Sequence, residues 1–181
     1  GRQDQLTQLR TGTEAKAGAI QHIRRVDKYS FPRKSLPAAR MAGELYGLNP
    51  VVILAQSAIE TGWGESSLAT CYNNFFGLTG YGVANAYWHG GKTDLDKPDG
   101  LLFRRYDSPE NSFLDFARLI ATVYKQAAAV SHYPRAYARE IAYSRYISEV
   151  NGDNRAAYCK MLESIAQSLV PIVYNLNNDS V

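Results

Sequence analysis

The sequence is best understood from one stretch, Ile53-Leu54-Ala55-Gln56-Ser57-Ala58-Ile59-Glu60-Thr61-Gly62-Trp63-Gly64-Glu65-Ser66. Asn49 and Pro50 come just before it, and this pair is typical of a helix N-cap followed by the first helical position. Apolar residues then recur at mixed three- and four-residue spacing, which predicts a helix that is mostly buried. Gly62 and Gly64 are expected to end it, because glycine readily adopts the left-handed conformation that terminates helices.

Glu60 is expected in the last turn of this helix, where the helix carbonyl groups disfavour a negative charge. Trp63, Phe75 and Phe76 are close in sequence and could form an apolar wall around the carboxyl group. Both conditions favour the protonated acid, which can donate a proton to a leaving oxygen near neutral pH. A lone glutamate at a helix end is more often a solvated residue. The glycine–aromatic–glycine turn that follows favours the catalytic interpretation.

The composition describes one globular domain with a mild positive charge. The chain has 181 residues, of which 45% are hydrophobic and 20% are charged, and this is enough for one sizeable core. The net charge of +3 suits an acidic polymer but lacks the clustered Lys and Arg of a nucleic-acid-binding surface. No apolar run approaches the roughly 20 residues of a membrane span. Gly1 and the polar start after it look like the scar of a tag, so we expect that an export signal was trimmed away.

The chain divides into an arm, two helical groups and a glycine-rich insert. Residues 1–28 are expected to form an N-terminal arm that packs on a domain of residues 29–181. Glycines cluster between about residues 72 and 106, where Pro98-Asp99-Gly100 is a turn signal and Leu101-Leu102-Phe103 resembles a short strand. This predicts an α+β fold that is predominantly helical, with a small β lobe and a cleft between two lobes.

Proline and capping residues predict where the other helices begin and end. After a break at Phe31-Pro32, Pro37 is expected to open a helix from Ala38 to Tyr46, with Met41 and Leu45 as core positions. Ser108-Pro109 is expected to start a strongly amphipathic helix. A further helix is expected over residues 135–142, and a last one, capped by Asp153 or Asn154, through Leu169 before Pro171.

Neither cysteine nor histidine predicts a metal or cofactor site. Cys71 and Cys159 allow either one disulfide or two free buried thiols, and their spacing is not that of metal ligands. His22, His89 and His132 are scattered. We therefore predict no metal and no cofactor.

Several segments resemble the N-acetylglucosaminidase family of peptidoglycan hydrolases, family 73 of the glycoside hydrolases. They are Ser35-Leu36-Pro37-Ala38, the stretch from Ile53 to Ser66, Asn74-Phe75-Phe76-Gly77-Leu78, and Phe103-Arg104-Arg105-Tyr106-Asp107-Ser108. The resemblance covers about residues 30–170. It implies a lysozyme-like fold, cleavage of cell-wall glycan outside the cytoplasm (periplasm, cell wall or secreted), and Glu60 as the catalytic acid.

The second carboxylate is the main departure from the family. Glycosidases usually use two carboxyl groups, about 5–5.5 Å apart for retention and about 6.5–9.5 Å for inversion. The family carries a glutamate in a Thr-Glu context in the β lobe, and Lys92-Thr93-Asp94 is the matching place here. Asp94 is thus the candidate, with Asp96 a weaker one, and a solvated loop position is an equally good interpretation of Asp94. Without a second carboxylate, the N-acetyl oxygen of the substrate could attack instead.

The resemblance also suggests roles for residues around the cleft. Tyr146, in Arg145-Tyr146-Ile147-Ser148, matches a family tyrosine that lines the active site and could bind the N-acetyl group or stabilise developing positive charge. Trp63, Asn74 and Phe76 are the expected substrate-binding residues, although Asn74 could equally cap a turn. The role expected for the Phe103–Ser108 run is mainly structural, with one arginine pairing with a carboxylate.

The preferred hypothesis is a peptidoglycan hydrolase that cleaves the β-1,4 bond after N-acetylglucosamine, with glycan strands as its partner. A lytic transglycosylase or a muramidase on the same scaffold is the first alternative. A non-catalytic glycan-binding protein is the second, and the missing β-lobe glutamate supports it. The sequence does not predict the oligomeric state.

Overall fold

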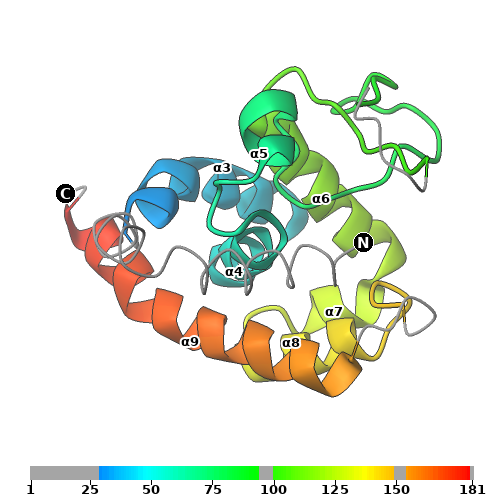
Figure 1. Ribbon diagram of the computed structural model, residues 1–181. Helices are drawn as coiled ribbons and strands as arrows, with labels where there is room; N and C mark the ends of the chain where they lie inside the picture. Colours follow the sequence, from blue (N-terminus) through cyan, green and yellow to red (C-terminus); the bar gives the residue numbers. More distant parts are fainter. Residues whose placement is uncertain (1–28, 94–99, 149–153, 180–181) are drawn as a thin grey trace, which may run out of the picture.

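The computed structural model describes residues 29–93, 100–148 and 154–179, and this part of the chain is predominantly helical (Figure 1). The N-terminal arm predicted for residues 1–28 lies outside the described residues. The helices are α3 (Ser30–Tyr46), α4 (Pro50–Thr61), α5 (Ser67–Tyr72), α6 (Pro109–Val123), α7 (Lys125–Ala129), α8 (Pro134–Ala142) and α9 (Arg155–Asp179). None of these described helices is both long and apolar enough to cross a membrane.

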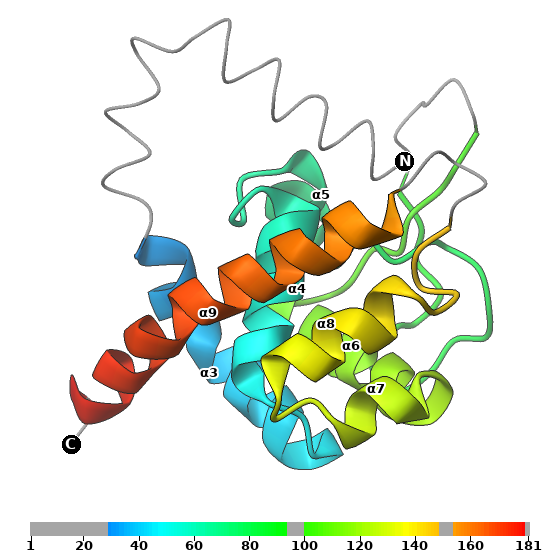
Figure 2. The ribbon, with the colours of Figure 1, turned by 90° about the horizontal axis from the view of Figure 1, so that it is seen from below.

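Helix α4 is the centre of the fold. It packs against α3, α8 and α9, and Figure 2 shows α9 crossing over it. Every residue from Val51 to Thr61 is buried, which confirms the prediction from its apolar spacing. The predicted ends are also confirmed. The Asn49 side chain accepts a hydrogen bond from the Val51 N–H (3.0 Å), and Gly62 ends the helix in the left-handed conformation at φ 56°.

Helix α3 begins earlier than predicted, because neither proline interrupts it. Pro32 lies in the first turn, where a backbone N–H has no helical partner to lose, and Pro37 lies on the exposed side of the helix. Met41 and Leu45 were wrongly predicted as core positions, since they are 42% and 60% exposed. The buried face instead carries small residues, which let the backbones approach closely. At Gly43, a Cβ would lie 2.5 Å from the Leu48 carbonyl oxygen.

Helix α9 extends past its predicted end at Leu169 and past Pro171. Its buried stripe continues to Val173, so packing against the body of the protein favours a continuous helix. Pro171 is exposed, and there water can satisfy the carbonyl group that proline leaves without a donor. Of the two caps predicted for this helix, the structure shows Asn154, whose side chain accepts the Ala157 N–H at 3.1 Å.

The segment predicted as a β lobe consists mainly of loops. We call its described part, residues 73–93 and 100–108, the loop segment. It contains two isolated antiparallel bridges, Thr79 with Phe103 and Lys92 with Arg104, and no longer strand among its described residues. The predicted strand at residues 101–103 is therefore wrong apart from Phe103. Side chains, more than paired strands, satisfy the backbone groups of this segment.

Asp115 on α6 holds the loop segment against the helices. Its buried carboxylate accepts hydrogen bonds from Arg104 (2.7 Å), the Tyr106 hydroxyl (2.6 Å), the Asn85 amide (2.9 Å) and Arg118 (2.9 and 3.0 Å). This confirms the expectation that an arginine of the Phe103–Ser108 run pairs with a carboxylate. Two elements that are not continuous in the chain are thereby joined at one buried charge.

Arg104, which pairs with Asp115, also contacts other parts of the loop segment. Its guanidinium also donates to the carbonyl oxygens of Thr79 (3.0 Å) and Tyr81 (2.7 Å), and it lies 4.0 Å from the ring centre of Trp88. Cation–π contact and charged hydrogen bonds therefore act on one side chain. Arg104 is thus a structural residue that supports the loops.

The two cysteines are free thiols. Cys71 is exposed and Cys159 is partly buried. Of the two alternatives that the sequence left open, the structure shows the free thiols, although Cys71 is not buried as that alternative supposed.

We predict that Asp115→Asn destabilises the protein by about 3–5 kcal/mol at neutral pH, because it leaves the charge of Arg104 poorly compensated. Burial alone would raise the pKa of Asp115, but the hydrogen bonds from Tyr106 and Arg118 and the charge of Arg104 together hold it below its ordinary 3.8. The free energy that the ionised Asp115 carboxylate contributes to folding is therefore complete above pH 3.8. It is lost as the pH falls through the lower pKa that Asp115 has in the folded state. Urea unfolding at several pH values measures it.

Asp107→Asn is the matched control, because Asp107 is a 73% exposed aspartate in the same region that pairs with His89. We expect this variant to change the unfolding free energy by less than about 0.5 kcal/mol. A cost for Asp115→Asn that matched the control, or that grew below pH 3.8, would contradict the role of Asp115 as a buried anchor.

Candidate active site

Glu60 lies in the last turn of α4 and is 3% exposed. The turn after it is built by Thr61, whose hydroxyl donates to the Ser57 carbonyl oxygen (2.7 Å) and accepts from the Gly64 N–H (2.8 Å). Trp63 adopts a positive φ of 61° in this turn, and Gly64 follows at 83°. Strain of this kind in a non-glycine residue is typical of functional sites. The predicted position of Glu60 at a buried helix end is confirmed.

The backbone of Gly77 faces the Glu60 carboxyl group. Gly77 has a φ of 66°, and a Cβ built on it would lie 3.2 Å from Glu60 Oε2. Position 77 thus favours glycine for two reasons, its left-handed backbone conformation and the close approach of the Glu60 carboxyl group. The loop that follows α5 therefore forms one wall of the carboxyl site.

Asn74 organises this loop from inside. Its side-chain oxygen accepts the N–H groups of Phe76 (3.2 Å), Gly77 (2.9 Å) and Leu78 (3.3 Å), and its amide nitrogen donates to the carbonyl oxygens of Leu78 and Arg104, both at 3.0 Å. The residue is fully buried. The structure thus gives Asn74 the turn-capping role that the sequence left open, in place of the predicted substrate contact.

Phe76 is a core residue and presents no face to a substrate. It is fully buried, stacked on Phe116 at 4.0 Å between ring centres, and meets Phe113 edge-on at 4.9 Å. Its predicted substrate-binding role is therefore corrected. Trp63 is different, because it stays partly exposed beside the Glu60 turn and packs edge-on against Phe31 at 6.2 Å.

Tyr146 belongs to the same aromatic cluster as the Gly77 loop. Its ring is 8% exposed and meets Phe116 edge-on at 6.3 Å and Tyr124 at 5.5 Å. Since Phe116 also stacks on Phe76, one continuous set of rings connects Tyr146 with the wall that faces Glu60. The connection between Tyr146 and Glu60, two of the three predicted catalytic residues, thus runs indirectly through Phe116, Phe76 and the Gly77 loop.

Asp94, the third predicted catalytic residue, lies outside the described residues. Its neighbour Thr93 is buried and fixed. The Thr93 N–H donates to the Phe103 carbonyl oxygen (2.8 Å), and the Thr93 hydroxyl accepts from the Phe103 N–H (3.1 Å). Arg104, which follows Phe103 in the chain, donates its backbone N–H to the carbonyl oxygen of Leu78, the residue after Gly77. The chain leading into Asp94 is therefore attached to the same loops that form the Glu60 site.

Gln56 is a residue that the sequence analysis missed. It lies one helical turn before Glu60 and is fully buried. Its amide oxygen accepts a hydrogen bond from the Tyr137 hydroxyl on α8, and its amide nitrogen donates to Tyr158 on α9 at 3.4 Å. Burial raises the pKa of Tyr137 well above its ordinary value, so this phenol stays a donor. The available signal was a glutamine inside an otherwise apolar helix.

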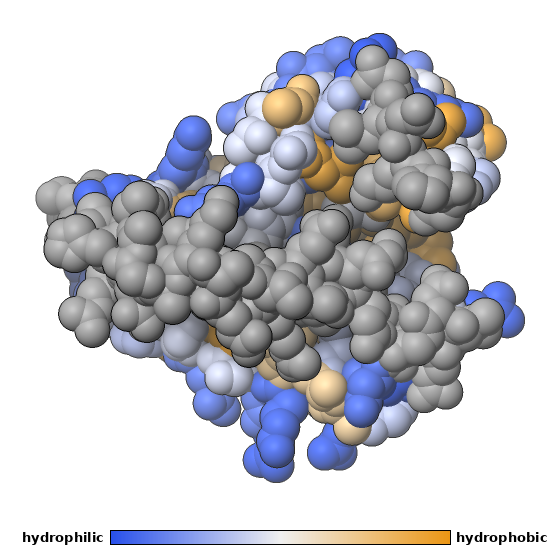
Figure 3. Space-filling model, viewed as in Figure 1, coloured by the Kyte–Doolittle hydropathy of each residue, from blue (hydrophilic) through white to orange (hydrophobic). Residues whose placement is uncertain are grey.

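In Figure 3, hydrophobic side chains gather beneath the loop segment at the upper right. In the ranges that the structure describes, no group of three His, Cys, Asp or Glu side chains lies close enough together to hold a metal ion.

The sequence profile of the glucosaminidase family, described as mannosyl-glycoprotein endo-beta-N-acetylglucosaminidase, matches residues 36–170. The chain belongs to this family. The match spans the Glu60 helix, the Gly77 loop, Asp115 and Tyr146, and so covers the whole candidate site of this glucosaminidase domain.

The glucosaminidase domain is similar to curated proteins and to solved structures. It is 27% identical over 129 residues to the peptidoglycan hydrolase FlgJ of Vibrio cholerae, covering 65% of this chain and 37% of that protein. It is 50% identical over 61 residues to a putative endo-beta-N-acetylglucosaminidase of Streptococcus pneumoniae. This match covers 34% of this chain and 9% of that protein. The chain therefore spans well under half the length of these relatives.

Among solved structures, the glycoside hydrolase domain of Salmonella typhimurium FlgJ is similar with a TM-score of 0.59 and 26% identity. The match covers 84% of this chain and 98% of that domain. The catalytic domain of the Listeria monocytogenes autolysin Auto is similar with a TM-score of 0.57 at 23% identity, over 84% of this chain and 86% of that one. The second likeness is evidence for the fold alone.

We predict that Gly77→Ala lowers the rate of cell-wall cleavage by about 10- to 100-fold, because the added methyl group displaces the Glu60 carboxyl group from its productive position. The variant should also lose about 1 kcal/mol of stability, since alanine is strained at positive φ. Loss of turbidity of purified cell walls measures the rate, and urea unfolding measures the stability.

Gly47→Ala separates these two effects. Gly47 ends α3 at φ 71°, and a Cβ there would meet nothing within 4 Å. We expect a similar loss of stability and a wild-type cleavage rate. Equal rates for the two variants would show that Gly77 does not position Glu60.

Proposed function

We propose that this glucosaminidase-family chain is a peptidoglycan hydrolase that cleaves the β-1,4 bond after N-acetylglucosamine, with Glu60 as the general acid. The observation that carries the proposal is the setting of Glu60. It is a 3% exposed carboxyl group at the carbonyl end of α4, against the backbone of Gly77. Burial and the helix end both favour the uncharged acid, which is the form that can protonate a leaving oxygen.

Asp94 is proposed as the second carboxylate. Proton transfer from Glu60 to the glycosidic oxygen would break the bond to the anomeric carbon and leave positive charge on the sugar ring. Asp94 would stabilise that charge or activate a water molecule, and Tyr146 would support the sugar from the aromatic cluster. The support for Asp94 is its attachment through Thr93 to the loops around Gly77. The product would be a strand with a reducing N-acetylglucosamine end.

The loop segment and the helices are proposed to form the two lobes of a lysozyme-like domain, with the substrate bound between them. The hydrophobic side chains gathered beneath the loop segment support this arrangement (Figure 3). Trp63, partly exposed beside the Glu60 turn, is the proposed stacking surface for a sugar ring. We place the activity outside the cytoplasm, because peptidoglycan is a wall polymer and the similar FlgJ proteins are named peptidoglycan hydrolases.

A lytic transglycosylase is the second candidate function. The observation that favours it is the absence of any glutamate between Leu78 and Tyr106 in the sequence. A single acid such as Glu60 would suffice for a reaction that ends in an intramolecular 1,6-anhydro sugar.

We predict that Glu60→Gln lowers the release of soluble fragments from purified peptidoglycan by at least about 1,000-fold, because an amide cannot donate the proton. Mass spectrometry of the wild-type digest should show strands that end in reducing N-acetylglucosamine. Glu65→Gln is the matched control, since Glu65 is an exposed glutamate five residues further along. Anhydro ends or reducing muramic acid ends would instead indicate a transglycosylase or a muramidase. An inactive wild-type protein that still binds glycan would indicate the binding role.

Asp94→Asn tests the second carboxylate. We predict a loss of at least about 100-fold in kcat, because the amide cannot act as nucleophile or base. Asp96→Asn, two residues further on, should stay near the wild-type rate. A near-wild-type kcat for Asp94→Asn would remove Asp94 from the mechanism and support attack by the N-acetyl oxygen of the substrate.

A further inference from the structure

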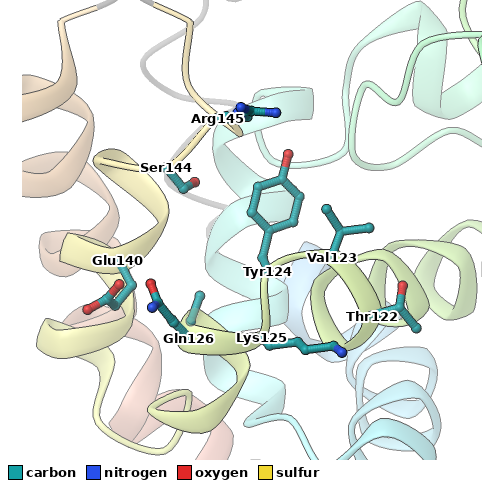
Figure 4. A pocket seen from close by; sticks show the side chains of 9 residues that line it. Thr122, Val123, Tyr124, Lys125, Gln126, Glu140, Ser144 and Arg145 are labelled. Carbon is teal, nitrogen blue, oxygen red and sulfur yellow. The ribbon is translucent and has the colours of Figure 1, made fainter.

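A pocket of about 590 Å³ lies beside the aromatic cluster, where the ends of α6 and α8 meet α7 (Figure 4). This volume is within the range of small-ligand sites. Tyr124 stands in the pocket, and Figure 4 shows Lys125 and Glu140 on opposite sides of it, with Arg145 above. None of these residues was among the predicted site residues.

The pocket adjoins the aromatic cluster that contains Tyr146. Tyr124 lines the pocket and also contacts the ring of Tyr146 at 5.5 Å between centres. Arg145, another lining residue, directly precedes Tyr146 in the chain. A ligand in this pocket would therefore lie close to Tyr146, which the proposed function places in the active site.

The pocket presents both signs of charge to solvent. Lys125, Glu140 and Arg145 are exposed, and in the part of the chain that the structure describes none of the three forms an ion pair. The other cationic side chains of the neighbouring site differ in this respect, since Arg104 and Arg118 are committed to Asp115. Charges that no neighbour compensates are available for a charged ligand.

We propose that this pocket binds the peptide that branches from the glycan strand of peptidoglycan. Arg145 and Lys125 pair with peptide carboxylates, and Glu140 accepts an ammonium or amide group. A neutral sugar chain needs no such charges, whereas the peptide carries both carboxylates and, in many walls, an amine. This inference rests on the proposed function, because it takes peptidoglycan as the substrate, and it makes the chain selective for peptide-bearing strands.

Binding measured in the Glu60→Gln background tests the inference without turnover. The probes are a soluble peptidoglycan disaccharide that carries a tetrapeptide and the same disaccharide without it, titrated by calorimetry at low and moderate salt. We expect the peptide-bearing probe to bind about tenfold more tightly at low salt, as two or three partly exposed ion pairs allow. The double variant Lys125→Ala/Arg145→Ala should abolish this advantage. Because both side chains are exposed, the variant should remain folded.

Arg139→Ala/Lys160→Ala is the matched control, because both residues are exposed cations on α8 and α9 that do not line the pocket. It should keep the tenfold advantage. Equal affinities for the two probes, or an advantage that survives in the double pocket variant, would overturn the inference. Failure of the proposed hydrolase function would appear separately, as the absence of reducing N-acetylglucosamine ends in the wild-type digest.

Discussion

The complete burial of α4 is the constraint on which the rest of the structure depends. A helix enclosed on all sides can carry a polar group only if that group has a partner. The hydroxyls of Ser57 and Thr61 donate to the carbonyl oxygens of Phe75 and Ser57, and Gln56 bonds to tyrosines on α8 and α9. The bonds of Ser57 and Gln56 tie α4 to the loop that contains Phe75 and to α8 and α9. Glu60 therefore stands on a rigid support and not on a mobile surface helix.

The loop segment depends on a second buried group, Asp115. Without extended strand pairing, a segment of this kind has few backbone contacts to define its shape, and side chains must provide them. Arg104 links Asp115 to the carbonyl groups of Thr79 and Tyr81, while Asn74 gathers the turn before Gly77. Buried charges cost solvation free energy, and here several hydrogen bonds to one carboxylate offset it. The result is a defined loop wall opposite Glu60.

Aromatic packing connects these two supports. Phe76 stacks on Phe116, which contacts Tyr146, which contacts Tyr124 at the edge of the charged pocket. Because these rings are buried and closely packed, the position of each ring constrains the position of its neighbours. The loop wall beside Glu60 and the pocket around Tyr124 are therefore connected through one set of buried, packed rings.

The sequence by itself determined the features that depend on local backbone chemistry and on periodicity. The Asn49 cap, the Gly62 stop, the burial of α4 and the Ser108 start of α6 were predictable, because capping and apolar spacing act within a few residues. The pairing of an arginine with a carboxylate was also expected, although its partner was not named.

Only the tertiary structure decided which side chains face inward. Phe76 and Asn74 were predicted to contact a substrate. In the structure Phe76 is fully buried against Phe116, and the side chain of Asn74 is hydrogen-bonded to the backbone of its own loop. Helix α9 continues past Pro171 because its apolar stripe has a surface to pack on, which no local signal shows. The role of Gln56 and the pocket around Tyr124 likewise arise where segments far apart in the chain meet. The physical reason is that burial is a property of the assembled elements, whereas caps and turns are properties of neighbouring residues.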